Sequence, residues 1–160
     1  MKKYGYTLLE LIISMAIMAI IGGVLIGFFS ASFRILNSET NRSSLRITIE
    51  SAMAQFENDL IPAKLVNSMG ASSINFWTDM DYDSTQDSNE VFSYSLSNGN
   101  LVRTVAGVSK NILYGVTGFN LSYDSAQAAS VHLVSLTLTA TSGTDSLTVK
   151  DQIMLRNNTN

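Results

Sequence analysis

The sequence predicts an α+β protein, in which one long N-terminal helix packs on a C-terminal antiparallel β-sheet. Three observations support this fold class. Residues 11–29 form an uncharged, almost wholly apolar run, and apolar residues then recur at helical spacing up to residue 60. The remainder consists of short alternating segments separated by turn residues. A helix followed by an antiparallel sheet packs as two layers around one core.

Composition restricts the function classes. The chain has 160 residues, enough for one domain with one hydrophobic core. It has no cysteine, which excludes disulfides, thiolate catalysis and cysteine-based zinc sites. The net charge of −3 gives no electrostatic indication of nucleic-acid binding. The apolar residues are concentrated near the N-terminus, so we expect a membrane anchor joined to an ordinary small domain.

The apolar run of residues 11–29 is long enough to cross a bilayer as a helix. Lys2 and Lys3 precede it, as in a secretory signal peptide. However, the run is long for a signal core, and no Ala-x-Ala-like cleavage site follows it. We therefore favour an anchor that remains on the protein and keeps the lysines on the cytoplasmic side of the membrane.

Glu10 lies at the start of the apolar run. A carboxylate is unfavourable in lipid, and such residues usually have a partner or a function. Its position alone leaves two interpretations open. Glu10 either lies in water at the membrane interface or serves a specific function.

Residues 2–20 resemble the signal of type IV prepilins and pseudopilins. The leader is basic and ends in Gly5, and Tyr6, Glu10 and the apolar run follow in the family's register. The resemblance implies that a membrane prepilin peptidase cuts between Gly5 and Tyr6 and that the new N-terminal amine of Tyr6 is methylated. It also implies that Glu10, the fifth mature residue, pairs with the Tyr6 amine of a neighbouring subunit during filament assembly.

Two features depart from the usual pattern of this family. The mature chain would begin with Tyr6 instead of phenylalanine, and the helix has no counterpart of the proline that bends many major pilins. Glycines occupy that part of the helix: Gly22, Gly23 and Gly27. Because glycine weakens a helix by up to about 1 kcal/mol but also permits close helix packing, the glycines fit either local melting or packing notches.

The patterns divide the chain into four segments. Residues 1–5 are the leader peptide and residues 6–29 the transmembrane and assembly helix. Residues 30–62 are an amphipathic helix that continues into the soluble domain, and residues 63–160 form a β-rich globular domain. Pro62 disfavours helix at Ile61 and marks the end of the helix. The apolar stripe of the amphipathic segment consists of Leu45, Ile49, Met53, Phe56 and Leu60.

Alternating segments predict the strands, at residues 73–77, 91–96, 101–105, 115–123, 134–140 and 147–155. Asn98-Gly99 is a strong tight-turn signal between the second and third of these. The alternation slips by one residue between Leu133 and Val134, which predicts a β-bulge there.

Parts of the soluble domain are similar to J-type minor pseudopilins and related tip-type minor pilins. The similar segments are residues 51–63, 91–96, 98–103, 116–123 and 155–157. The similarity implies a structural subunit that initiates or caps a type IV pilus or a type II secretion pseudopilus. Its partners would be the prepilin peptidase/methyltransferase, other pilins or pseudopilins and the inner-membrane assembly platform.

The same resemblance implies a single-pass protein of the bacterial inner membrane, with its C-terminal domain in the periplasm or outside the cell. Two alternatives remain at this point. A major pilin would be abundant along the filament. A membrane-anchored surface binding domain, dependent on calcium or not, would never polymerise.

Five acidic residues follow the calcium-loop spacing of an EF-hand: Asp79, Asp81, Asp83, Asp87 and Glu90. Clustered carboxylates repel one another, and a hard cation such as Ca²⁺ would relieve that repulsion. Ser84 stands where such a loop normally has glycine for its sharp turn. A solvated acidic loop is therefore the alternative to a calcium site.

The sequence contains no recognisable catalytic constellation, and we predict that the protein is not an enzyme. His132 is the one histidine, so no multi-histidine metal site can form, and no Gly-x-Ser-x-Gly motif occurs. Three aromatic residues, Phe76, Trp77 and Tyr82, are assigned to the core, with an exposed binding patch as the alternative.

Overall fold

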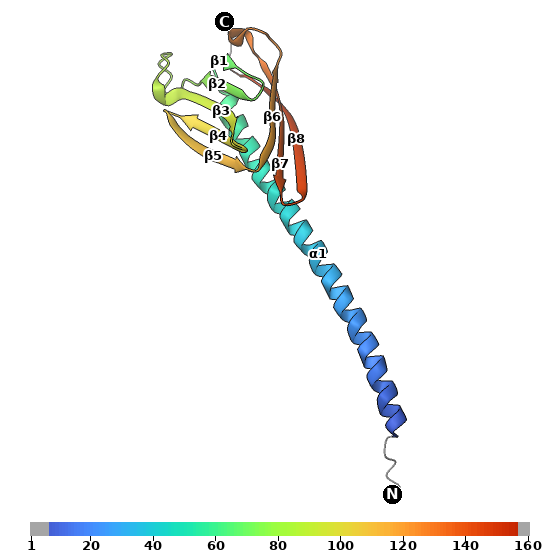
Figure 1. The fold of residues 1–160 in the computed structure, drawn as a ribbon. Coiled ribbons are helices and arrows are strands. Elements are labelled where there is room, and N and C mark those ends of the chain that lie inside the picture. Colours follow the sequence, from blue (N-terminus) through green and yellow to red (C-terminus); the bar gives the residue numbers. More distant parts are fainter. Residues whose placement is uncertain (1–6, 157–160) are drawn as a thin grey trace. The chain divides into compact units, whose positions relative to one another are not determined.

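The computed structural model describes residues 7–156, and the chain divides into two compact units, Met1–Thr40 and Asn41–Asn160. The helix α1 spans Leu8–Leu60 (Figure 1). It ends two residues before Pro62, as predicted, because proline disfavours helical backbone at the residue before it. The helix also runs without a break through Gly22, Gly23 and Gly27.

The predicted apolar stripe of α1 is buried in the second unit. Its five residues all belong to the core, and Ala52 joins them. Phe56 lies at the centre, where its ring contacts Tyr94 and Phe119 edge-on, with centroid distances of 4.8 and 6.1 Å. Since Tyr94 and Phe119 belong to different sheets, the last turns of the helix pack on both.

Two antiparallel sheets follow α1 in the second unit (Figure 1). The first has the order β1-β2-β3-β4-β5 and the second the order β6-β7-β8, so neighbouring strands are consecutive in the chain. The strands are β1 (Leu65–Met69), β2 (Ser73–Trp77), β3 (Val91–Ser97), β4 (Asn100–Val105), β5 (Val108–Tyr114), β6 (Val116–Tyr123), β7 (Leu133–Ser142) and β8 (Asp145–Met154).

Gly115 is the one residue between the two sheets, because β5 ends at Tyr114 and β6 begins at Val116. Its φ angle is +69°, and a Cβ atom there would lie 2.5 Å from the Thr141 carbonyl oxygen. The Gly115 carbonyl in turn accepts a hydrogen bond from the Thr141 N–H at 2.8 Å. The chain can therefore pass from one sheet to the other only through a residue without a side chain.

The structure confirms the α+β fold class and an antiparallel partner for each predicted strand. Two strands, β1 and β5, were not predicted. The predicted bulge is wrong: Leu133 pairs with Met154 and Val134 with Ile153 without a shift, because the change of phase falls where β7 begins. Tyr82 is 88% exposed and does not belong to the core, whereas Phe76 is fully buried.

Candidate functional site

The first turn of α1 is closed by a capping box between Thr7 and Glu10. The Thr7 N–H donates to Glu10 Oε2 at 2.9 Å, and the Thr7 hydroxyl donates to the same oxygen at 3.1 Å. The Glu10 N–H donates to Thr7 Oγ1 at 3.3 Å. Such reciprocal bonds satisfy backbone donors that the start of a helix leaves unpaired. Gly5 and Tyr6, the predicted processing site, lie outside the described residues.

The N-terminal part of α1 is apolar and exposed in the isolated chain. None of its most apolar stretch is buried. By length and composition this helix can cross a membrane, a criterion that signal sequences near an N-terminus also meet. Glu10 is exposed together with the large apolar residues that follow it.

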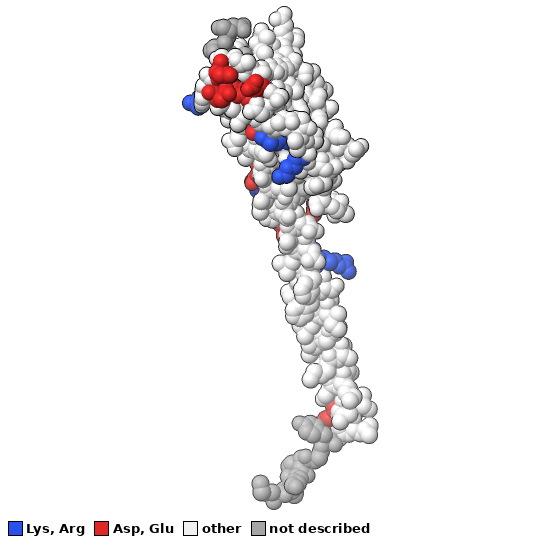
Figure 2. All heavy atoms as spheres, turned by 90° about the vertical axis from the view of Figure 1, so that its left-hand side faces the viewer, with Lys and Arg blue, Asp and Glu red and all other residues white. Residues whose placement is uncertain are grey.

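The acidic segment between β2 and β3 brings three of its five predicted metal ligands together. One carboxylate oxygen each of Asp79, Asp81 and Asp83 lies within 4.8 Å of the others. Asp87 and Glu90 do not belong to this group. The segment protrudes beside the first sheet in Figure 1, and Figure 2 shows acidic side chains concentrated in one patch of the second unit.

Glu90 is only 1% exposed and accepts hydrogen bonds from the protein itself. Trp77 Nε1 donates to Oε2 at 3.0 Å, and the Met80 N–H donates to Oε1 at 2.6 Å. Longer bonds come from the backbone N–H groups of Asp81 and Asp87. The Trp77 bond, with these backbone bonds, outweighs desolvation and lowers the pKa of Glu90. Glu90, at the end of the acidic segment, therefore binds the backbone at the start of the segment through these hydrogen bonds.

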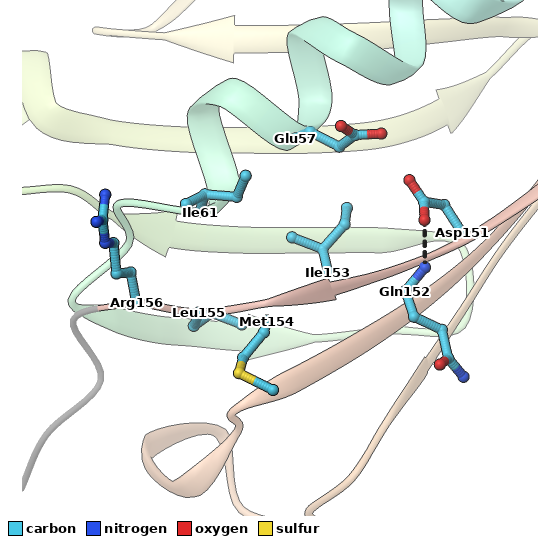
Figure 3. A pocket seen from close by; sticks show the side chains of 8 residues that line it. All are labelled: Glu57, Ile61, Asp151, Gln152, Ile153, Met154, Leu155 and Arg156. Carbon is cyan, nitrogen blue, oxygen red and sulfur yellow. Dashed lines mark hydrogen bonds between the residues drawn. The ribbon is translucent and has the colours of Figure 1, made fainter.

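A carboxylate pair, which the sequence did not indicate, lies between α1 and β8. Glu57 and Asp151 line a pocket of about 580 Å³, and Figure 3 shows their carboxyl groups facing each other. The hydrogen bond to Asp151, desolvation and the charge of Asp151 raise the pKa of Glu57 to about 7. Asp151 also accepts a bond from the Gln152 N–H at 2.7 Å. Sequence analysis missed this pair because Glu57 and Asp151 are far apart in the sequence. Only the packing of β8 on α1 brings them together.

His132 is exposed, and its backbone N–H donates a hydrogen bond to Asp124 Oδ1 at 3.1 Å. Within residues 7–156, neither this histidine nor the carboxylate pair adjoins a serine in the arrangement that nucleophilic catalysis requires.

Comparison with known proteins places the N-terminus in a family. Residues 1–26 match the prokaryotic N-terminal methylation motif. No curated protein and no solved structure matches the chain significantly. Proteins with this motif are structural rather than enzymatic, and the motif implies processing by a prepilin peptidase and assembly with other pilins. This motif at the start of the chain, together with one long apolar helix packed against antiparallel sheets, supports a type IV pilin-like protein.

Proposed function

We propose that this chain is a minor pilin or pseudopilin, a structural subunit that helps to initiate or cap a thin filament. The observation that carries the proposal is the register of its N-terminus. The methylation motif covers residues 1–26, and α1 starts at Leu8 with Glu10 in its first turn. The order of a glycine, a predicted cut site, a glutamate and an exposed apolar helix supports a subunit that is processed and then assembled.

In this proposal the prepilin peptidase cuts between Gly5 and Tyr6 and releases residues 1–5. Residues 6–29 then anchor the chain in the inner membrane, and residues 30–62 continue the helix into the soluble domain. Residues 63–160 lie in the periplasm or outside the cell. Cleavage before the apolar run leaves the anchor on the mature chain, so an assembly platform can move the subunit from the membrane into a filament.

Glu10 has two successive partners in this scheme. In the free chain its carboxylate accepts hydrogen bonds from the N–H and hydroxyl groups of Thr7. In a filament it would face the amine of Tyr6 on a neighbouring subunit. Desolvation offsets most of the attraction within such a buried pair, so its main effect is on register rather than on stability.

The preference for a minor subunit rests on residues 51–63, 91–96 and 98–103, which are similar to J-type and tip-type subunits. In the structure these three segments contribute one polar cluster. Asp59 accepts hydrogen bonds from Tyr94 and from Arg103. The similarity therefore covers residues that hold the end of α1 to the first sheet, which supports a shared domain core.

The first experiment is intact-mass and N-terminal analysis of the protein from cells with and without the prepilin peptidase. We expect a mature chain that starts at methylated Tyr6, and only when the peptidase is present. An intact leader in both strains, or a cut beyond Phe29, would contradict the proposal and favour a signal-anchored or secreted binding domain.

Two substitutions of Glu10 separate helix capping from assembly. Glu10→Gln keeps a side chain that can complete a capping box but removes the charge, whereas Glu10→Ala removes both. If the charge serves assembly, both variants are processed at Tyr6 and both fail to enter sheared filaments. If Glu10→Gln enters filaments as well as the unchanged chain, the charge has no assembly role. A membrane-tethered binding domain would tolerate both changes.

Copy number distinguishes a minor from a major subunit. Quantitative mass spectrometry of sheared filaments should find this chain at a small fraction of the main subunit, and deletion of its gene should reduce the number of filaments. Finding it as the most abundant filament protein would replace the minor assignment with a major one.

A further inference from the structure

The segment from Asp79 to Glu90 has a backbone arranged around its own carboxylates. The Asp83 N–H donates to Asp81 Oδ1 at 3.2 Å, and the Thr85 N–H donates to Asp83 Oδ1 at 2.6 Å. Each bond occupies one oxygen of a carboxylate and leaves the other available. Ser84 has a φ angle of +63°, so it adopts the left-handed conformation for which such loops normally use glycine.

Asp79 supplies a separate observation, because one of its oxygens is buried without a hydrogen bond. Its side chain is only 3% exposed. Oδ2 accepts from the Lys64 ammonium and, at 3.3 Å, from the Ser84 N–H. Among the described residues no donor reaches Oδ1 with hydrogen-bond geometry. A buried carboxylate oxygen without a donor is unfavourable, so a positively charged ligand at Oδ1 would be stabilising.

The charges of the cluster match a divalent cation. Asp79, Asp81 and Asp83 contribute three negative charges, and Lys64 contributes one positive charge, which leaves two negative charges within the group. The donors are oxygen atoms without histidine or cysteine, and oxygen donors are those that Ca²⁺ and Mg²⁺ prefer.

We propose that this segment is a calcium site, formed by Asp79 Oδ1 and the carboxylates of Asp81 and Asp83. Calcium is favoured over magnesium because Ca²⁺ accepts irregular ligand sets, whereas Mg²⁺ requires near-octahedral geometry. Glu90 is occupied by Trp77 and backbone donors, so water would complete the coordination. A site with few protein carboxylates should be weak, with a dissociation constant on the order of 10⁻⁴–10⁻³ M.

The site would control the shape of the connection between β2 and β3. Met80 and Tyr82 alternate with the ligands in this segment and are 59% and 88% exposed. Neutralising the carboxylates removes their mutual repulsion and fixes the position of these two apolar side chains. Calcium would thus determine how the segment presents an apolar surface, independently of whether the chain enters a filament.

The test uses the purified full-length chain in detergent after removal of metals with a chelator. Titration calorimetry with Ca²⁺ measures affinity directly. Terbium luminescence gives a local readout, because the single tryptophan, Trp77, donates to Glu90 beside the segment and can sensitise a bound lanthanide. We expect saturable binding, displacement of terbium by Ca²⁺ and weaker displacement by Mg²⁺.

Asp81→Asn and Asp83→Asn test the ligands, because both side chains are exposed and neither contacts the core. Each should weaken calcium binding at least about tenfold, as expected on loss of a charged ligand. Asp145→Asn, which removes a carboxylate from the distant β7–β8 turn, should leave binding unchanged. Calcium should also raise the melting temperature of the unchanged chain but not that of the double variant Asp81→Asn/Asp83→Asn.

Absence of saturable binding up to about 10 mM Ca²⁺ would overturn the proposal, since even weak extracellular calcium sites bind below this concentration. Binding that survives both ligand substitutions would overturn it as well. Neither result bears on the proposed filament function, which is tested separately by the processing of Gly5–Tyr6 in cells.

Discussion

Arg103 on β4 binds Asp59 in the last turn of α1 through two nitrogen atoms. Nε lies 2.5 Å from Oδ2, and Nη2 lies 3.2 Å from Oδ1. The Tyr94 hydroxyl on β3 donates to the same Oδ2. Desolvation, followed by the hydrogen bond to Asp59, raises the pKa of Tyr94, so its hydroxyl stays protonated and remains a donor. One carboxylate therefore ties the end of the helix to two neighbouring strands.

Asp59→Ala should destabilise the globular unit by about 3 kcal/mol, because it leaves a largely buried guanidinium without its carboxylate and leaves the buried Tyr94 hydroxyl only a 3.5 Å bond to the Gln55 carbonyl. The Arg103 and Asp59 side chains are only 24% and 16% exposed. Urea unfolding of the full chain in detergent, followed by the fluorescence of Trp77, measures the loss.

The exposed pair Arg46–Glu50 on the same helix is the control. Its side chains are 71% and 54% exposed, and Glu50→Ala should change the unfolding free energy by less than about 0.5 kcal/mol. Equal losses in the two variants would show that burial of the Asp59 cluster adds nothing to its strength.

The sequence predicted those elements whose signal is local. The apolar stripe of α1 is buried as expected, and Asn98-Gly99 forms the turn between β3 and β4. Strand β5 was missed because only Leu113 in it is buried, so its residues show no alternation to detect. Strand β1 was missed for the same reason, since Val66 is its one buried residue. Both strands lie at the edges of the first sheet, where one face and one side meet solvent.

In the candidate sites too, the sequence predicted what local spacing determines and missed what tertiary packing determines. Spacing predicted that Asp79, Asp81 and Asp83 lie together, because the backbone of a short loop sets their distances. Spacing did not predict that Glu90 accepts a hydrogen bond from Trp77 instead of joining the aspartates, since tertiary packing brings that donor to Glu90. The pairing of Glu57 with Asp151 on β8 could not be predicted either, because tertiary packing alone brings the two carboxylates together.

The loop between β4 and β5 contains an unfavourable residue that can be improved. Ala106 has a φ angle of +52° and is followed by Gly107 at +76°. A two-residue hairpin loop of this kind needs positive φ at both positions, which asparagine tolerates better than alanine. Ala106→Asn should therefore stabilise the chain by about 0.5–1 kcal/mol in urea unfolding.

The reciprocal change in the β3–β4 loop provides the control. Asn98 has a φ angle of +49° before Gly99 at +72°, so Asn98→Ala should destabilise by a similar amount. If both substitutions shift stability in the same direction, a property other than backbone conformation determines the effect.

Gly115 should tolerate no side chain. Gly115→Ala would impose positive φ on alanine and also bring its Cβ within 2.5 Å of the Thr141 carbonyl oxygen, where the chain passes between the sheets. We expect a loss of about 3 kcal/mol or more in urea unfolding. Gly143 has a φ angle of +61° but nothing within 4 Å of such a Cβ, so Gly143→Ala should cost about 1 kcal/mol. Equal losses would exclude a contribution from the contact with Thr141.

The Glu57–Asp151 pair should make stability fall as the pH rises. The folded pKa of Glu57 is about 7, above its ordinary value of 4.5, so the folded chain holds a proton that the unfolded chain releases. The resulting stabilisation is complete below about pH 4.5 and is lost as the pH rises through 7. Solvent screening at this partly exposed pair limits the change to about 1 kcal/mol.

Melting temperatures of the full chain between pH 5 and 8 test this expectation, since that range spans the loss of the shared proton. Glu57→Gln removes the titrating group but keeps a donor for Asp151, so its melting temperature should vary less and should exceed that of the unchanged chain at pH 8. Glu50→Gln, on an exposed face of the same helix, should leave the pH dependence as it is. If Glu57→Gln and the unchanged chain lose stability equally above pH 7, the proton is not held between α1 and β8, and other groups govern the pH response.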